Sequence, residues 1–442
     1  MPEKEQNNQN DFMIERIKER PINRKKLLRR TILTAAMAVI FGLIACFTFL
    51  VLEPVISNWL YPEEEPQIVV LPEDLEEMSP EDMLAENLPT ESPVPEEEQE
   101  GVVLEKEQID EILSGVVLDR QNYKEIYAAL SNYVTELNHY MVTVTVVTSN
   151  IDWFNNVQES KSQTSGIIIT DNGKELLILT DASYLSSAES LTLTFYTGDQ
   201  VDAQIKQTDS YTNLAVLAVS LEDLPVGMKK EKLAYPVLGS SNTKLLGMPV
   251  IAMGSPMGTS NSIGYGMITS ASSTYSVPDR NYKIIQTDII GSQNASGVLF
   301  NLDGQVVGII TGNKSGSDMK NIIYAYGITE MKKIIEKLSN GSEIAYLGIS
   351  GLNVTPEASG ELGVPLGGFV KKMDMDSPAM LAGIQQGDVI INIDGRNIST
   401  FNEYTNIVMQ LEPGKTIEMT VKRKSQDEYK EMKFTMEAGE AK

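Results

Sequence analysis

Gly291-Ser-Gln-Asn-Ala-Ser-Gly-Val-Leu-Phe-Asn301 runs directly into Leu302-Asp-Gly-Gln-Val-Val-Gly-Ile-Ile-Thr311, and this stretch decides the fold. A loop leads into a short apolar strand. Asp303-Gly304 is a typical two-residue hairpin turn, because both residue types tolerate positive φ. A second apolar strand follows it. The stretch therefore predicts a loop, a strand, a tight turn and a second strand.

The length and composition of the chain limit the number of domains and the chemistry that it can carry out. A chain of 442 residues predicts two or three domains. The net charge is −25, but residues 62–100 alone hold fifteen acids and no Lys or Arg. The remainder is only mildly acidic, so no nucleic-acid surface is expected. With one cysteine (Cys46) and one histidine (His139), we expect no intrachain disulfide, no metal site and no cofactor.

The N-terminal part reads as a membrane anchor. Residues 1–30 are polar with a basic second half, and residues 31–52 form a run of 22 residues without a charge. At 1.5 Å per residue this run spans about 33 Å, enough to cross a bilayer. A cleaved signal peptide is the competing interpretation, but the run is long and lacks a small-x-small cleavage pattern. We predict a cytoplasmic tail, a single transmembrane helix and an extracytoplasmic bulk.

Two segments separate this anchor from the folded part. Residues 53–105 combine proline and glutamate, which predicts a disordered acidic linker. Residues 106–138 carry apolar side chains at helical spacing, which predicts a membrane-proximal helix. That helix would serve either oligomerisation or packing on its own domain.

Two β-rich domains follow. Residues 139–340 contain many short strands separated by Gly, Asn and Asp turns, which predicts a barrel or sandwich closed by a helix at 328–338. Residues 341–438 form a smaller α+β module. Its helix at 377–383 has an N-cap Ser, a following Pro and a terminal Gly. A second helix at 401–411 has four side chains on one face: Tyr404, Ile407, Val408 and Leu411.

The smaller module resembles a PDZ domain. Ser377-Pro-Ala-Met-Leu-Ala-Gly-Ile384 and Gln386-Gly-Asp-Val-Ile-Ile-Asn-Ile-Asp-Gly395 carry the likeness. The resemblance implies that Tyr346, Leu347, Gly348 and Ile349 bind the terminal carboxylate of a peptide through backbone N–H groups, while the 401–411 helix face forms the side-chain pocket. Consecutive N–H donors around a glycine do form anion-binding nests. The alternative is that these residues only pack the core of the module.

The larger domain resembles the HtrA family of trypsin-like serine proteases along its whole length. The motifs are Thr180-Asp-Ala-Ser-Tyr-Leu185, Thr212-Asn-Leu-Ala-Val-Leu217, Val250-Ile-Ala-Met-Gly-Ser-Pro-Met-Gly258 and Gln286-Thr-Asp288. The resemblance implies a mainly β fold with a trypsin-like double β-barrel followed by the PDZ domain. It also implies a homotrimer.

The catalytic positions implied by this resemblance are all replaced. The histidine position holds Ser183, the aspartate position Asn213 and the nucleophile position Ala295, while Gln293 stands for an oxyanion glycine. A one-residue gap would instead place Ser296 at the nucleophile, so Ser296 is a minor candidate. A serine hydroxyl is a weak nucleophile without a base, and Ser183 cannot replace an imidazole near neutral pH. The sequence therefore predicts a pseudoprotease.

Other bases are conceivable but poorly supported. Ser241-Asn-Thr-Lys244 has Ser-x-x-Lys spacing, and Lys161 or Lys174 would need to approach Ser296 in the fold. His139 would need a wholly new geometry to act as the base.

The sequence is compatible with three functions. The leading one is a membrane-anchored scaffold, sensor or quality-control factor that binds peptide or protein C-termini through the PDZ domain. The first alternative is an active serine endopeptidase that uses Ser296 with a non-histidine base. The second is an oligomeric envelope scaffold built on the 106–138 helix.

Overall fold

The structure is a computed structural model. It describes residues 24–60, 66–72, 74, 120–151, 157–228, 233–312, 321–426 and 428–441. The chain divides into two units, residues 1–65 and 66–442.

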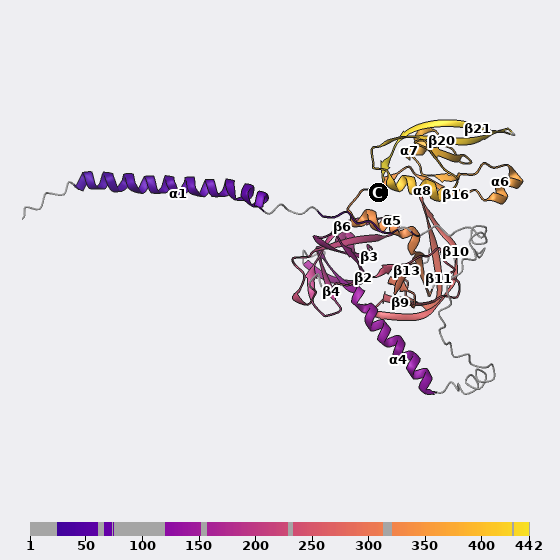
Figure 1. Ribbon diagram of the computed structural model, residues 1–442, viewed down its shortest axis with the longest axis horizontal. Coiled ribbons are helices and arrows are strands. Elements are labelled where there is room, and N and C mark those ends of the chain that lie inside the picture. Colours follow the sequence, from indigo (N-terminus) through magenta and orange to yellow (C-terminus); the bar gives the residue numbers. More distant parts are fainter. Residues whose placement is uncertain are drawn as a thin grey trace, which may run out of the picture. The chain divides into compact units, whose positions relative to one another are not determined.

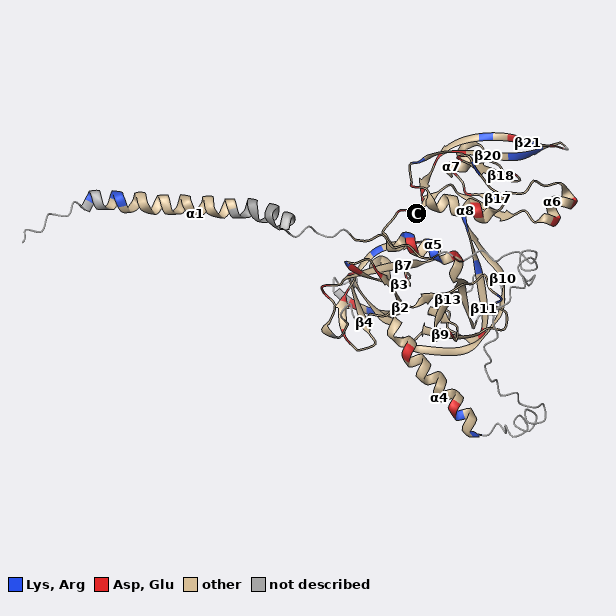
Figure 2. Ribbon diagram, in the orientation of Figure 1, with Lys and Arg blue, Asp and Glu red and all other residues tan. Residues whose placement is uncertain are grey.

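The first unit contains one long helix, α1 (Arg24–Leu60). Its segment Leu28–Thr48 is long and apolar enough to cross a membrane, with a mean hydropathy of 2.2. Figure 2 shows basic residues at the start of α1 and none in the uncharged stretch that follows. The helix also includes residues 53–60, which differs from the extended linker predicted there. Residues 55–60 contain neither charge nor proline, so nothing after Pro54 interrupts the helix.

The second unit begins with a seven-stranded antiparallel sheet (Figure 1). In β2, Ile168 points into the core of this sheet, whereas Ile167 and Ile169 face the opposite side. This alternation follows from the two-residue period of a strand. In spatial order the strands are β5 (Gln200–Asp202), β4 (Ser190–Phe195), β1 (Met141–Ile151), β2 (Val157–Asp171), β3 (Glu175–Asp181), β7 (Leu214–Ser220) and β6 (Gln204–Asp209).

A second seven-stranded sheet holds the 291–311 stretch. The β12–β13 hairpin turns at Asp303-Gly304 as predicted, and the β12–β13 pairing closes this sheet on itself. In spatial order the strands are β12 (Ser296–Phe300), β9 (Pro249–Ser255), β10 (Ser262–Val277), β11 (Arg280–Ile290), β14 (Ile322–Gly327), β13 (Gln305–Thr311) and β8 (Val237–Leu238).

A shared hydrophobic core joins the two sheets. It takes one face of each sheet and the apolar side of α5 (Ile328–Ser339). Helix α4 (Arg120–Leu137) packs its C-terminal part on this core but leaves Tyr123, Ile126 and Tyr127 exposed. The 106–119 part of the predicted helix lies outside the described residues. Short 3₁₀ turns lie at η1 (Asn138–Tyr140), η2 (Leu185–Ser187) and η3 (Val226–Met228).

Residues 66–72 and Asp74, here called the strap, pack against α5. The Val69 N–H donates to Asn340 Oδ1, and Asn340 Nδ2 donates to the Val69 carbonyl, each at 2.8 Å. Asp74 forms a buried ion pair with Lys332. Burial raises the pKa of Asp74, but hydrogen bonds from Lys332 and Thr329 outweigh it and leave the pKa below its ordinary value. The strap lies within the segment predicted to be a disordered linker, so the structure differs from that prediction.

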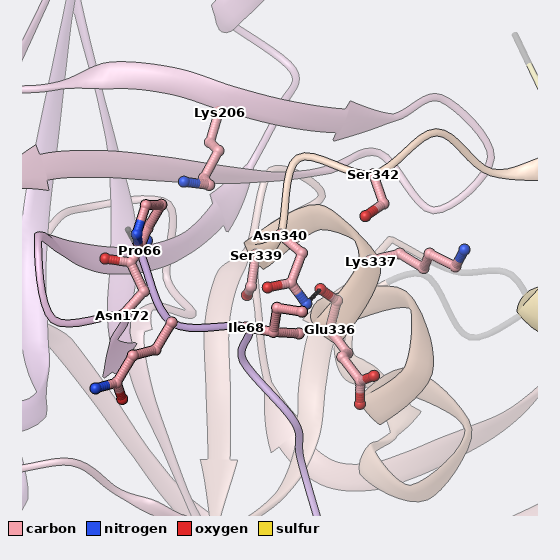
Figure 3. A pocket seen from close by; sticks show the side chains of 10 residues that line it. Pro66, Ile68, Asn172, Lys206, Glu336, Lys337, Ser339, Asn340 and Ser342 are labelled. Carbon is pink, nitrogen blue, oxygen red and sulfur yellow. Dashed lines mark hydrogen bonds between the residues drawn. The ribbon is translucent and has the colours of Figure 1, made fainter. Parts of the chain in front are cut away.

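A pocket of about 350 Å³ lies beside the strap (Figure 3). Two of its polar side chains have partners, because Lys206 pairs with Glu175 and Asn340 with Val69. The buried Ser339 Oγ has no hydrogen-bond partner among the described residues. The pocket lies where the strap meets α5. Its lining is Pro66, Gln67, Ile68, Asn172, Lys206, Glu336, Lys337, Ser339, Asn340 and Ser342.

The C-terminal module has its own core and its own sheet. Ser377 caps α7 (Pro378–Ala382) by accepting the Met380 N–H, and Gly383 ends that helix at φ 103°, as predicted. The other helices are α6 (Pro356–Leu362) and α8 (Phe401–Gln410). The main sheet has the order β16 (Ile349–Asn353), β17 (Gly368–Met373), β18 (Val389–Ile393), β20 (Thr416–Ser425) and β21 (Glu428–Glu437), with β19 (Arg396–Asn397) on β18, and β15 (Ala345–Tyr346) pairs with β22 (Gly439–Glu440).

Gly297 is packed too tightly to accept a side chain. It lies in β12 at φ 122°, and an added Cβ would come within 2.0 Å of the Met253 carbonyl oxygen. We expect Gly297→Ala to cost about 3 kcal/mol or more from overlap and backbone strain. This corresponds to a fall in Tm of roughly 6–12 °C, measured by circular dichroism. Gly312→Ala is the matched control, because nothing lies within 4 Å of its Cβ position. Equal Tm values for the two variants would contradict the packing described here.

Candidate functional site

Asn213 and Ser183, the positions predicted for the acid and the base, do come together. Asn213, held at φ 61°, donates through Nδ2 to Ser183 Oγ at 2.7 Å. The same amide reaches both carboxylate oxygens of Asp181 at 3.2 Å. The Ser183 N–H also donates to Asp181 Oδ1, at 2.8 Å. This is a closed group of an amide, a hydroxyl and a carboxylate, and it contains no imidazole.

Ser296, the minor candidate nucleophile, lies among hydroxyl groups. Its Oγ is 3.0 Å from Thr164 Oγ1 and 3.0 Å from Ser165 Oγ. All three residues are buried, with no more than 5% of their surface exposed. Ser296 begins strand β12 and pairs with Ser255 of β9. Hydroxyls have no suitable pKa to take its proton, so this cluster does not activate the serine.

Two N–H groups of the loop before β12, those of Asn294 and Ala295, are engaged within the loop. Ala295 is buried and carries no hydroxyl. Its N–H, which would be an oxyanion donor at a nucleophile position, donates to the Ser292 carbonyl at 3.2 Å. The Asn294 N–H donates to Ser292 Oγ, also at 3.2 Å. The loop therefore satisfies these two donors internally, whereas catalysis needs donors aimed at the substrate.

Ser241 and His139 each contact groups other than Ser296. Ser241 is fully buried, and its Oγ accepts the Thr329 N–H at 3.1 Å at the start of α5 and donates to Glu330 at 3.3 Å. Burial raises the pKa of Glu330 above its ordinary value. His139 Nδ1 lies 2.9 Å from the Glu136 carbonyl, and its ring packs on Tyr196. Lys161 is exposed on β2, and Lys174 lies in the turn between β2 and β3. Among the described residues, no group of three or more His, Cys, Asp or Glu is placed to hold a metal ion.

In the C-terminal module, three of the residues predicted to bind a carboxylate converge on the side chain of Asp279. The backbone N–H groups of Leu347 and Gly348 donate to Oδ2 of Asp279 at 2.8 Å each. The Ile349 N–H donates to Oδ1 of the same side chain at 2.9 Å. Gly348 has φ 83°, which lets three consecutive donors converge. The three predicted residues therefore surround one carboxylate.

Tyr404 adds a fourth donor to this nest. Its hydroxyl donates to Asp279 Oδ1 at 2.5 Å. Burial and the neighbouring carboxylate raise the pKa of Tyr404 well above its ordinary value, so the hydroxyl stays protonated. Burial also raises the pKa of Asp279, against the hydrogen bonds from Tyr404 and the three N–H groups, which lower it.

The remaining predicted residues have structural contacts. Tyr346 lies in β15, and its hydroxyl donates to Asp374 at 2.9 Å. Val408 and Leu411 are buried in the core of the module, and Ile407 is partly buried against it. Sequence reasoning missed Asp279, since Val277-Pro-Asp-Arg280 reads as an ordinary hairpin turn.

Comparisons with known proteins agree with this architecture. A trypsin-like peptidase domain matches residues 164–309, and a PDZ domain matches residues 345–433. The putative serine protease HhoA of Synechocystis sp. is 31% identical over 286 residues, or 59% of this chain and 67% of the relative. A probable periplasmic DegP-like serine endoprotease of Halomonas elongata is 30% identical over 274 residues, or 60% of this chain and 55% of the relative. The chain thus spans little more than half the length of that second relative.

Among the solved structures that match is the HtrA-type protease AlgW with a decapeptide. It covers 70% of this chain and 98% of its own, at 23% identity and a TM-score of 0.49.

Proposed function

Because this chain belongs to the HtrA family of trypsin-like serine proteases with a C-terminal PDZ domain, we propose that it is a catalytically degenerate member that binds peptide or protein C-termini. The observation that carries the proposal is the nest of Leu347, Gly348 and Ile349. Its three N–H groups already hold a carboxylate, at 2.8–2.9 Å. A peptide C-terminus presents the same chemical group, and an added strand would extend the sheet beside β16.

The degenerate triad supports binding rather than cleavage. Ser183 and Asn213 contact each other through an amide-to-hydroxyl hydrogen bond, which moves no proton. When the base and the nucleophile of such a triad are lost, the remaining rate enhancement is only about 10³–10⁴-fold over the reaction in water. The role of scaffold, sensor or quality-control factor follows, since the chain would hold a C-terminus without consuming it. An endopeptidase based on Ser296 is the alternative, and a fluorophosphonate probe distinguishes it from a binding protein.

Membrane anchoring is part of the same proposal. The Leu28–Thr48 segment meets the length and hydropathy of a span, and basic residues precede it. A positive cluster before a span favours a cytoplasmic N-terminus, with the folded unit outside. One relative is named as a periplasmic protease, which is consistent with an extracytoplasmic location. We also propose the acidic linker, the predicted domain boundaries and a homotrimer. The exposed Tyr123, Ile126 and Tyr127 of α4 offer an apolar face for assembly.

The test is carboxylate-dependent retention of peptides by the full chain in detergent. The probe is a pooled random decapeptide library with free C-termini, applied at millimolar total concentration. The matched control is the same library with amidated C-termini. We expect at least about tenfold more retention of the free acids, because one charge-assisted hydrogen bond contributes roughly 1.5–3 kcal/mol. Equal retention of acids and amides would contradict the proposal.

A further inference from the structure

The peptide groove of this protein is filled by a segment of its own chain. The long β10–β11 hairpin ends in a two-residue turn, Pro278-Asp279, beside α8 and β16 (Figure 1). We propose that Asp279 is an internal ligand of the PDZ domain, so that an external C-terminus binds only by displacing the hairpin tip. This inference rests on the proposed peptide-binding function and adds its regulation.

The carboxylate site is already saturated by Asp279. Both of its oxygens are used, by three backbone N–H groups and by the Tyr404 hydroxyl. Each of these N–H groups has one hydrogen to donate. A peptide carboxylate therefore cannot bind the same donors while Asp279 is in place. The two carboxylates must compete for one site.

The strand edge is occupied as well. The Asp279 N–H donates to the Ile349 carbonyl at 2.7 Å, and Asn281 Nδ2 donates to the Gly351 carbonyl at 3.0 Å. From the helix side, Thr405 Oγ1 donates to the Asp279 carbonyl at 2.9 Å. An added peptide strand would need these acceptors on β16. The hairpin tip thus engages both features that a peptide ligand uses.

The hairpin is built to deliver this side chain. A hairpin tip normally faces water, yet Asp279 is only 2% exposed. It lies at φ 64°, a conformation that aspartate and asparagine adopt more readily than most residues. The next residue, Arg280, is buried and pairs with Asp209 at 3.0 Å, which fixes the end of the hairpin to the first sheet. A buried carboxylate is costly unless it is hydrogen-bonded, and these four donors meet that requirement.

Competition has a defined consequence for affinity. The apparent affinity for an external peptide is the affinity of the open groove multiplied by the fraction of molecules in which the groove is open. Linkage is reciprocal, so a peptide that opens the groove also frees the hairpin from the PDZ domain. Peptide binding would thereby release one domain from the other.

The test compares the wild-type full chain with Asp279→Asn. Asparagine keeps the shape and the φ preference but places an NH₂ group against N–H donors and removes the charge. Asp279→Gly, which also tolerates positive φ, is a second variant in case the first misfolds. Asp303→Asn, at the exposed turn of the β12–β13 hairpin, is the matched control. Two readouts are taken: hydrogen exchange of the Leu347–Ile349 amides, and retention of the free-acid and amidated decapeptide libraries.

We expect exchange at these amides to be at least about tenfold faster in Asp279→Asn and Asp279→Gly, with no change in Asp303→Asn. We also expect these two variants to bind the free-acid library at least about tenfold more tightly than the wild type does. Unchanged exchange in both Asp279 variants would overturn the internal ligand, whatever the peptides do. Faster exchange without free-acid binding would support the internal ligand and instead overturn the proposed peptide-binding function.

Discussion

A fluorophosphonate probe is expected to leave the full chain unlabelled. Such probes react with a serine whose proton is removed by a nearby base. Ser296 Oγ has hydroxyl partners at 3.0 Å in Thr164 and Ser165, and the base position holds Ser183. Labelling and casein cleavage should therefore stay at the level of the Ser296→Ala variant.

Trypsin is the positive control. Treated in the same way, it establishes that the probe is reactive. Labelling of the wild type that disappears in Ser296→Ala would show an activated serine. That result would favour the endopeptidase over the pseudoprotease. The base that activates Ser296 would then lie outside the hydrogen bonds described for this serine.

Arg423→Met is expected to destabilise the PDZ domain by about 3 kcal/mol, because it leaves a buried carboxylate without its cation. Arg423 donates to both oxygens of Asp388, at 2.7 and 2.8 Å, and also to the Gly383 carbonyl. The Asp388 side chain is fully buried, whereas 21% of the Arg423 side chain is exposed. Hydrogen bonding to Asp388 raises the pKa of Arg423, which keeps the guanidinium charged. Hydrogen exchange of the β18 and β20 amides measures the loss.

Lys433→Met is the matched control for that variant. Lys433 pairs with Glu418 in the same sheet at 2.7 Å, but both side chains are more than half exposed. Surface ion pairs contribute little because water screens them. We therefore expect Lys433→Met to leave exchange almost unchanged. Similar losses in the two variants would mean that burial of Asp388 does not determine the stability of the domain.

Local sequence patterns predicted the fold because their signals are short-range. The Asp303-Gly304 turn and the Ser377 cap of α7 each depend on a few neighbouring residues. The mainly β fold with a C-terminal PDZ domain is confirmed by the structure and the family matches. The converging donors of Leu347, Gly348 and Ile349 were also predicted, since a glycine at positive φ is what allows them to converge.

The partner of those donors could not be predicted from the sequence. Asp279 is 68 residues before Leu347 and belongs to another domain. Its local pattern, Pro-Asp at a hairpin tip, is typical of turns that face water. Only the packing of the two domains buries this carboxylate, and no periodicity in the sequence encodes that packing.

A short apolar run in the sequence marks the strap, although the average composition of the region favours disorder. The proline and glutamate content of residues 53–105 favours disorder, yet Ile68-Val-Val-Leu71 is an apolar run within it. Val69 from this run is buried, and its backbone pairs with Asn340. A short apolar run between acidic stretches therefore marked a packed segment that average composition did not reveal.

One measurement tests the central claim, that this HtrA member binds C-termini without cleaving them. The full chain is incubated with the free-acid decapeptide library, and bound and unbound peptides are identified by mass spectrometry. The expected result is that retained peptides are intact, carry free C-termini, and become more abundant with Asp279→Asn. The result that would contradict the claim is a set of internal cleavage products that forms with the wild type and disappears with Ser296→Ala.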